Sequence, residues 1–280
     1  MKSKRAYILA ALPFALLVLL YELAPLATVI LRSFQTAGGL GFTLEHYAAI
    51  FSKPLYRMAV TNSIAVSLAS SCIGMVIGFW GAKAAHGAAG RLKNFFMSVL
   101  NMCSNFAGLP LAFAFIIMFG NVGVFVLLGK QYGIEVLAQF NIYGLSGLML
   151  TYVYFQIPLC VLLLIPAFEA LRKEWRESVS LLGGNSLYFW RKVGFPVLLP
   201  SLLGTLSVLF SNALAAYATA YALLQGNFSL LPIRISEQFV GDMVQRKEFG
   251  SALAVVMMLL MVAAILCQNA VLRRTKGAAR

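Results

Sequence analysis

Charged residues are scarce in this 280-residue sequence: Asp, Glu, Lys and Arg make up only 11% of it, and hydrophobic residues make up 61%. A soluble domain usually carries about 25% charged residues. A large core does not explain this deficit, whereas a bilayer does, because apolar side chains can face lipid. The apolar runs continue from end to end, so we expect residues 1–280 to form one membrane domain.

Histidine and cysteine are also rare, with two and four residues respectively. The four cysteines fall inside apolar runs without a CxxC pair, so we expect no disulfide. His46 and His86 are isolated, and no nucleophile–base pair stands out. Residues 87–93 have the wrong spacing for a phosphate-binding loop. We therefore expect no metal, no cofactor and no enzymatic activity in this chain.

Acidic residues are few as well, 9 against 22 Lys and Arg, and the formal charge is +13. The basic residues form short clusters between apolar runs, so orientation in a membrane explains them better than nucleic acid does. With the N-terminus in the cytoplasm, 15 of the 22 would lie inside and 7 outside. The positive-inside rule then places both termini in the cytoplasm.

The long apolar runs predict about six transmembrane helices, because a spanning helix needs roughly 20 mostly apolar residues. The third run continues toward residue 128, where a short membrane-surface helix is the alternative. The predicted spans are 6–31, 59–84, 95–119, 143–165, 198–224 and 251–272.

One cytoplasmic segment, residues 167–197, is too patterned for a plain linker. Residues 167–182 lack Gly and Pro and favour a helix, which Gly183 and Gly184 would end. Asn185 or Ser186 would cap a second short helix that carries Tyr188, Phe189 and Trp190. We expect a helix–turn–helix, the construction of a docking element.

This segment resembles the permeases of binding-protein-dependent importers of the ATP-binding cassette (ABC) class. Their pattern is Glu-Ala-Ala, three residues, Gly, nine residues, Ile-x-Leu-Pro. The sequence has Glu177-Ser178-Val179, three residues, Gly183, nine residues and Val193-Gly194-Phe195-Pro196. Glu, Gly and Pro match, while small or apolar residues replace the others. The segment between the fourth and fifth spans is where the family carries this pattern.

The resemblance implies an all-helical type I importer permease in the bacterial inner membrane. Residues 167–197 would be the coupling helices that contact separate ATPase subunits. A second permease, identical or homologous, and a periplasmic or lipid-anchored solute-binding protein would complete the complex with membrane lipid. The resemblance assigns ATPase coupling to Glu177, Ser178, Val179, Gly183, Val193 and Pro196.

A finer resemblance, to the polyamine, ferric-iron and aminophosphonate branch, comes from Tyr217-Ala218-Thr219, Gly226 and Leu231-Pro232-Ile233. An ion-gradient-driven secondary transporter is the alternative function. Such a protein would favour paired intramembrane acids and an internal repeat, and neither is evident here.

Polar residues inside the spans are candidates for the translocation path, because they are costly in lipid. On one continuous helix Ser201, Thr205, Asn212 and Thr219 would share an arc of about 40°. Asn105 and Gln156, each shortly before a proline, are further candidates. Helix packing is the alternative role for all of them.

Overall fold

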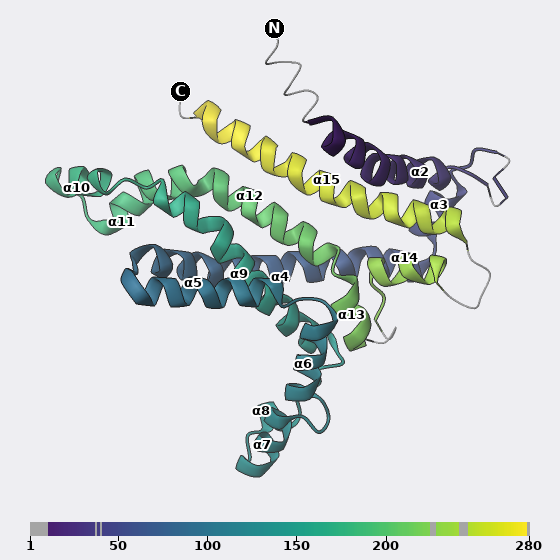
Figure 1. The fold of residues 1–280 in the computed structure, drawn as a ribbon, viewed down its shortest axis with the longest axis horizontal. Coiled ribbons are helices and arrows are strands. Elements are labelled where there is room, and N and C mark those ends of the chain that lie inside the picture. Colours follow the sequence, from purple (N-terminus) through teal and green to yellow (C-terminus); the bar gives the residue numbers. More distant parts are fainter. Residues whose placement is uncertain (1–10, 37, 40, 225–227, 241–245, 279–280) are drawn as a thin grey trace, which may run out of the picture.

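A computed structural model describes residues 11–36, 38–39, 41–224, 228–240 and 246–278. Within these ranges the chain is helical, apart from turns and one isolated antiparallel bridge between Gln35 and Phe42. The long helices run along a common direction, with α10 and α11 at one end of the bundle and α3 and α14 at the other (Figure 1). Six helices among the described residues are long and apolar enough to cross a membrane.

Residues 11–18 are helical and lead into a π-helical turn, and the long C-terminal helix comes last. From that turn on, the helices in chain order are η1 Leu19–Leu23, α2 Ala24–Ser33, α3 Glu45–Ser52, α4 Pro54–Gly87, α5 Gly90–Asn105, α6 Leu109–Phe119, α7 Val124–Tyr132, α8 Glu135–Ala138, α9 Leu145–Glu169, α10 Lys173–Leu181, α11 Ser186–Phe189, η2 Trp190–Gly194, α12 Phe195–Leu214, α13 Tyr217–Leu224, α14 Leu231–Phe239 and α15 Lys247–Ala278.

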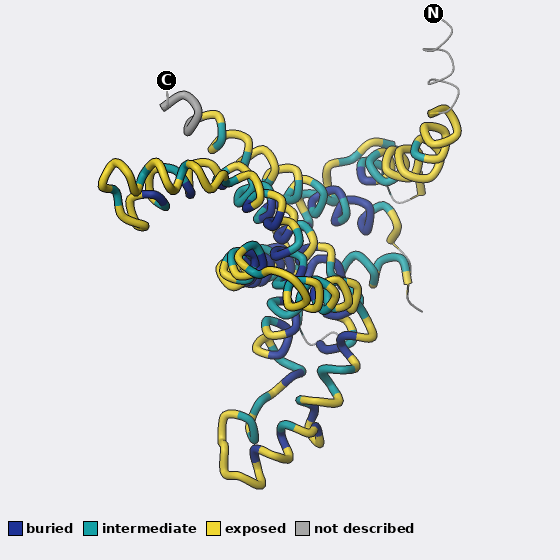
Figure 2. The backbone as a smooth tube through the Cα atoms, turned by 60° about the vertical axis from the view of Figure 1, so that its left-hand side comes forward, coloured by how far each residue is buried: buried dark blue, intermediate teal, exposed yellow. Residues whose placement is uncertain are grey.

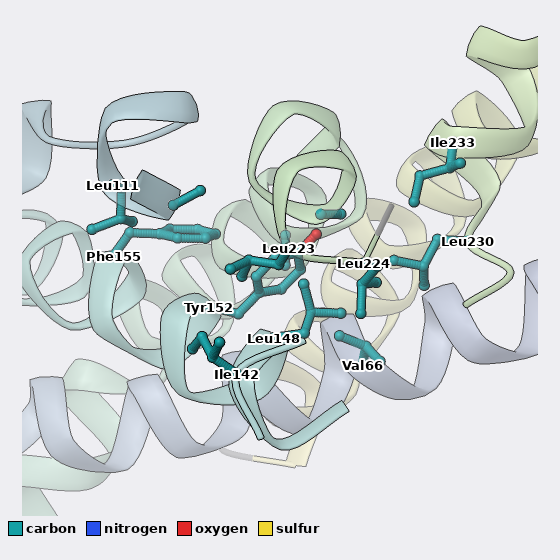
Figure 3. Packing of buried hydrophobic residues seen from close by; sticks show 13 residues of the cluster. Val66, Leu111, Ile142, Leu148, Tyr152, Phe155, Leu223, Leu224, Leu230 and Ile233 are labelled. Atoms are coloured by element: carbon teal, nitrogen blue, oxygen red, sulfur yellow. The ribbon is translucent and has the colours of Figure 1, made fainter. Parts of the chain in front are cut away.

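Three buried clusters follow α4 from one end to the other. Ala82 packs in a cluster near α10, Val66 in the middle cluster, and Ala59 in the cluster beside α14 and α15. Figure 3 shows the middle cluster, in which Tyr152 and Leu148 of α9 meet Leu223 and Leu224 of α13. Exposed positions lie along the outer faces of the helices and on α7 and α8 (Figure 2).

The seam between α4 and α9 is built on glycines with no room for a side chain. A Cβ on Gly78 would lie 2.5 Å from the Cys160 sulfur, and a Cβ on Gly74 would lie 2.9 Å from the Gln156 Cβ. Small residues at such spacing let membrane helices approach closely, which favours dispersion contacts between their backbones. The seam therefore fixes α4 against α9 along much of their length.

Six spans were predicted and the count is confirmed, but two of the predicted ranges are wrong. Residues 95–119 are two helices, because α5 ends at Asn105 and α6 begins at Leu109 after Gly108, whose φ is 72°. Pro110 lies in the first turn of α6, where its missing N–H costs nothing. The crossing segment by length and composition is Leu109–Tyr132, which consists of α6 and α7 with a break at residues 120–123. The apolar continuation toward residue 128 is therefore a separate short helix, α7.

Residues 198–224 are also two helices. The helix α12 ends at Leu214, and α13 begins at Tyr217. The Tyr152 hydroxyl donates to the Ala216 carbonyl at 2.8 Å, which gives one backbone group of this break a partner. A non-helical backbone at membrane depth requires such partners, because lipid offers none.

Candidate functional site

The predicted helix–turn–helix is present as α10 and α11, which we call the α10–α11 hairpin (residues 173–189). The predicted helix 167–182 is shorter than expected. The helix α9 ends at Glu169, and Arg172 adopts an extended backbone with ψ 138° before α10 begins. The chain therefore bends between the span and the hairpin.

The turn between α10 and α11 is closed by backbone hydrogen bonds. The Gly184 N–H donates to the Val179 carbonyl at 2.9 Å, and the Gly183 N–H donates to the Ser180 carbonyl at 3.1 Å. Gly183 has a φ of +78° and is the left-handed residue of a Schellman helix end. The prediction that the glycine pair ends the helix is confirmed.

Asn185 caps the second helix, which confirms the first of the two predicted capping residues. Its side-chain oxygen accepts a hydrogen bond from the Tyr188 N–H at 2.8 Å. This bond satisfies one of the free donors at the start of α11. With both ends closed in this way, the hairpin holds a defined shape through local bonds.

One of the three predicted aromatic anchors, Trp190, attaches the base of the hairpin to the spans. Phe189 is buried, and the Trp190 ring meets Phe168 of α9 and Phe79 of α4, with ring centroids 6.3 and 6.1 Å apart. Tyr188 is exposed. The base of the hairpin is therefore packed, and its tip is free among the described residues.

The tip of the hairpin exposes large apolar side chains, a feature that the sequence reasoning missed. Leu181 and Leu182 are 88% and 87% exposed, and Leu187 is 75% exposed. We call these three residues the apolar tip. The leucine just before the helix-ending glycine pair could have indicated this tip. The sequence alone does not show whether its side chain faces the spans or points away from them.

The residues assigned to ATPase coupling lie along this hairpin and its return to α12. Glu177 and Ser178 are exposed on α10, and the carbonyl of Val179 closes the turn. Val193 lies in the π-helical segment η2, and Pro196 lies in the first turn of α12. The structure thus groups Glu177, Ser178, Val179 and Gly183 on one hairpin, and places Val193 and Pro196 on its return segment.

The five translocation candidates fall into two groups by exposure. Gln156, Thr205 and Thr219 are buried, whereas Asn105 and Asn212 are exposed. Thr219 lies on α13 and not on α12, so the predicted stripe on one continuous helix is interrupted. The Thr219 hydroxyl donates to the Gly108 carbonyl at 3.2 Å, so the start of α13 meets the break between α5 and α6.

Gln156 joins three spans. The hydrogen-bonding network orients its amide so that the nitrogen donates to the Leu209 carbonyl of α12 at 3.2 Å. The amide oxygen then accepts from the Ser70 and Ser71 hydroxyls of α4 at 2.8 and 3.3 Å. This fully buried side chain has the contacts of a packing residue.

The fold and the hairpin define a multi-span helical membrane protein with an ordered helical hairpin at one end, and comparison with known proteins shows its family. Residues 72–277 match the family described as binding-protein-dependent transport system inner membrane component. That match covers well over half of the sequence, so the chain belongs to this family. It is a multi-pass inner-membrane protein, not an enzyme, and the secondary-transporter alternative is not supported.

Two relatives show how far the sequence similarity extends. A probable sulfate transport system permease protein from Helicosporidium sp. subsp. Simulium jonesii is 23% identical over 261 residues, which is 92% of each chain. The thiamine transport system permease protein of Escherichia coli (strain K12) is 29% identical over 130 residues. That alignment takes 45% of this chain and only 24% of the relative's length.

Two solved structures share the fold. One comes from a bacterial ABC transporter involved in the import of the acidic polysaccharide alginate, with a TM-score of 0.73, 14% identity and coverage of 97% of this chain and 96% of that one. The other comes from the MetNI methionine ABC transporter, with a TM-score of 0.59, 16% identity and coverage of 80% and 99%. The similarity confirms the predicted fold class, the all-helical fold of an ABC importer permease.

Proposed function

We propose that this chain forms the translocation path of an ABC importer and that the α10–α11 hairpin transmits force from separate ATPase subunits. A solute-binding protein would deliver a small solute on the opposite face, and a second permease, identical or homologous, would complete the path. The apolar tip of the hairpin is the observation that carries this proposal. The family to which the chain belongs supports it.

The apolar tip needs a partner that is not lipid alone. Leu181 and Leu182 lie between the α9 span and the next candidate span, Ser186–Leu214, which has Leu187 in its first turn. All three lie on a hairpin whose shape is set by the glycine turn and by Asn185. Clustered apolar side chains exposed to water mark protein interaction sites. A partner that receives these leucines gains apolar burial without first ordering the loop that carries them.

The packing at the base of the hairpin explains how force from the ATPase subunits would reach the spans. Trp190 at this base packs against Phe79 of α4 and Phe168 of α9, and the buried Phe189 contacts Trp190, so a displacement of the tip would be passed to those spans. In the proposed cycle, ATP binding draws two such hairpins together and opens the helix bundle outward, and hydrolysis resets it. The two states differ in their contacts, and those contacts link the ATPase site to the solute site.

Orientation is part of the proposal: the hairpin end would face the cytoplasm, together with both termini. The excess of basic residues on that side supports it. Reporter fusions after Lys93 should report cytoplasm, and fusions near Lys53 should report the outside. Exchange of these two results would reverse the orientation.

For the substrate, we propose the solutes of the polyamine, ferric-iron and aminophosphonate branch, together with thiamine-like compounds. The supporting residues Leu231, Pro232 and Ile233 are buried, and the Ser63 hydroxyl accepts from the Leu231 N–H at 2.8 Å. Gly226 lies outside the described residues. Uptake competition with spermidine, ferric iron, 2-aminoethylphosphonate, thiamine and sulfate tests the branch, and competition by sulfate alone would contradict it.

Substitution of Gly183 by valine tests the coupling role. A Cβ at Gly183 would meet no atom within 4 Å, so the only cost is the left-handed φ of +78°. That cost is on the order of 1–2 kcal/mol for a side chain that resists positive φ. A cost of this size changes a two-state equilibrium by roughly 5- to 30-fold. Gly183→Val should leave the spans inserted but lose transport, with ATPase subunits released or no longer stimulated by loaded binding protein.

Two variants control this experiment. Gly183→Asn should retain transport, because asparagine tolerates the left-handed conformation. Gly133→Val carries the same strain at φ +69°, also in open space, but on the turn after α7; it should keep its ATPase subunits. Normal transport by Gly183→Val, or equal loss of ATPase subunits from Gly133→Val, would remove the main support for the proposal.

A further inference from the structure

A basic hollow lies where the end of α4 meets the α10–α11 hairpin. Its volume is about 990 Å³. Residues from the last turns of α4, the end of α9, the bend before α10, α10 itself and the start of η2 contribute to its wall. We call it the basic pocket, and it is lined by Lys83, His86, Gly87, Phe168, Leu171, Arg172, Lys173, Arg176, Glu177, Ser180, Leu181, Phe189 and Trp190.

The charges on the wall of the basic pocket are not balanced. Four lysine and arginine side chains line it, whereas Glu177 is its one carboxylate. The ion pairs within the described residues are Lys93–Glu169 and Arg234–Glu237, so none of the four is paired there. Like charges around one concave surface repel each other and concentrate a positive potential. An anion in the pocket would remove that repulsion. The four residues are Lys83, Arg172, Lys173 and Arg176.

The other part of the wall is apolar. Phe168 and Phe189 are buried, and Leu171 and Trp190 also line this part of the wall. A small inorganic anion gains nothing from such a surface. A ligand with a phosphate at one end and hydrocarbon at the other matches both parts of the wall.

Lys83 places the pocket at the level of the lipid headgroups. Its ammonium lies 4.7 Å from the Trp80 ring centroid and 4.9 Å from the Trp190 ring centroid. Trp80 is 59% exposed one turn before Lys83 on a spanning helix. Exposed tryptophans near the ends of spans lie at the membrane–water interface. The ammonium between the two rings therefore connects the lipid-facing side of α4 with the pocket.

We propose that the basic pocket binds the phosphate headgroup of an anionic phospholipid. Basic pockets between transmembrane helices at the cytoplasmic side bind such headgroups. The phosphate would be shared between Lys83 of α4 and the Arg172–Arg176 segment, and it would link the span to the base of the hairpin. This proposal rests on the residues that line the pocket and does not depend on the proposed coupling role of the hairpin.

Lipid retention by the purified full chain tests this site. The chain is prepared in mixed micelles that contain phosphatidylglycerol or phosphatidylcholine, and bound lipid is counted by native mass spectrometry. Wild-type protein should retain phosphatidylglycerol in preference to phosphatidylcholine. Arg176→Gln and Lys83→Gln should each weaken retention of phosphatidylglycerol by about fivefold, the typical effect of one basic residue at an anionic surface.

The control is Arg91→Gln, because Arg91 is exposed at the start of α5 at the same end of the bundle and does not line the pocket. It should retain phosphatidylglycerol as the wild type does, and all variants should elute as folded protein. Equal weakening by Arg91→Gln would show a diffuse surface charge and overturn the proposal.

Two further experiments distinguish an anionic lipid from other possible occupants of the basic pocket. Inorganic phosphate at the same concentration should not displace phosphatidylglycerol, because it cannot use the apolar wall; full displacement would show a free-phosphate site instead. ATPase subunits should bind without releasing the lipid. Release of the lipid on their binding would mean that the pocket receives a protein side chain, which contradicts the proposal.

Discussion

Two glycine-containing regions of this protein are built in opposite ways. At the α4–α9 seam, Gly78 has an ordinary helical backbone, but a Cβ there would lie 2.5 Å from the Cys160 sulfur. In the hairpin, Gly183 has a left-handed backbone, but a Cβ there would meet nothing within 4 Å. The seam depends on contacts between distant residues, and the hairpin depends on local backbone conformation. Substitutions should therefore damage stability at the seam and communication at the hairpin.

The largest loss of stability is expected from Gly78→Leu. Forcing side-chain atoms into a packed interior costs about 1–3 kcal/mol, and more where helices must separate. The variant should accumulate poorly in membranes and aggregate at a lower temperature in detergent, as measured by fluorescence-detected size exclusion. Gly87→Leu, at the end of the same helix with nothing within 4 Å, is the control. If Gly78→Leu accumulated as well as Gly87→Leu, the seam would not hold the bundle together.

A smaller loss is expected from Gln156→Leu. The variant removes the bonds from α9 to α4 and α12, each worth about 0.6 kcal/mol on average between membrane helices. Once Gln156 is replaced, the Ser70 and Ser71 hydroxyls can donate instead to the Ser67 carbonyl, which lies 3.2 and 2.6 Å away, so neither hydroxyl loses every partner. Thermal unfolding should shift downward modestly while uptake by the remaining folded protein persists. Lost uptake at unchanged stability would instead place Gln156 on the translocation path.

The smallest effect on stability is expected from Asn212→Leu. Asn212 is exposed on α12, so the substitution removes no buried contact. If Asn212 lines the path, uptake should fall while the assembled complex and its ATPase activity remain intact. Co-purification of the subunits and transport assays measure both quantities. Loss of assembly would show that Asn212 packs against another subunit.

The sequence was sufficient for the number of spans and for the turn at which α10 ends and α11 begins. Span number follows from composition, which depends on each residue's own transfer energy. The end of α10 and the cap of α11 follow from Gly183, Gly184 and Asn185, whose backbone preferences act locally. These features need no knowledge of distant contacts.

The two helix breaks could not be predicted in the same way. The predicted range 95–119 joined the more polar α5, which ends with Asn101, Ser104 and Asn105, to the apolar α6. Gly108-Leu109-Pro110 marks the start of α6. The break after α12 has neither glycine nor proline at residues 215–216. Its Ala216 carbonyl is satisfied by Tyr152, which is 64 residues away. Because that contact is tertiary, only the structure shows why Thr219 leaves the predicted stripe.

The central claim is that the apolar tip contacts the ATPase subunits, and site-specific photo-crosslinking measures that contact directly. A photoreactive phenylalanine analogue is placed at Leu182, 87% exposed on the hairpin, or at Val136, 80% exposed on α8, in the assembled transporter in membranes. The account predicts a crosslink from position 182 to the ATPase subunit and none from position 136. An active transporter that gives no crosslink from 182, or gives one from 136 instead, would contradict it.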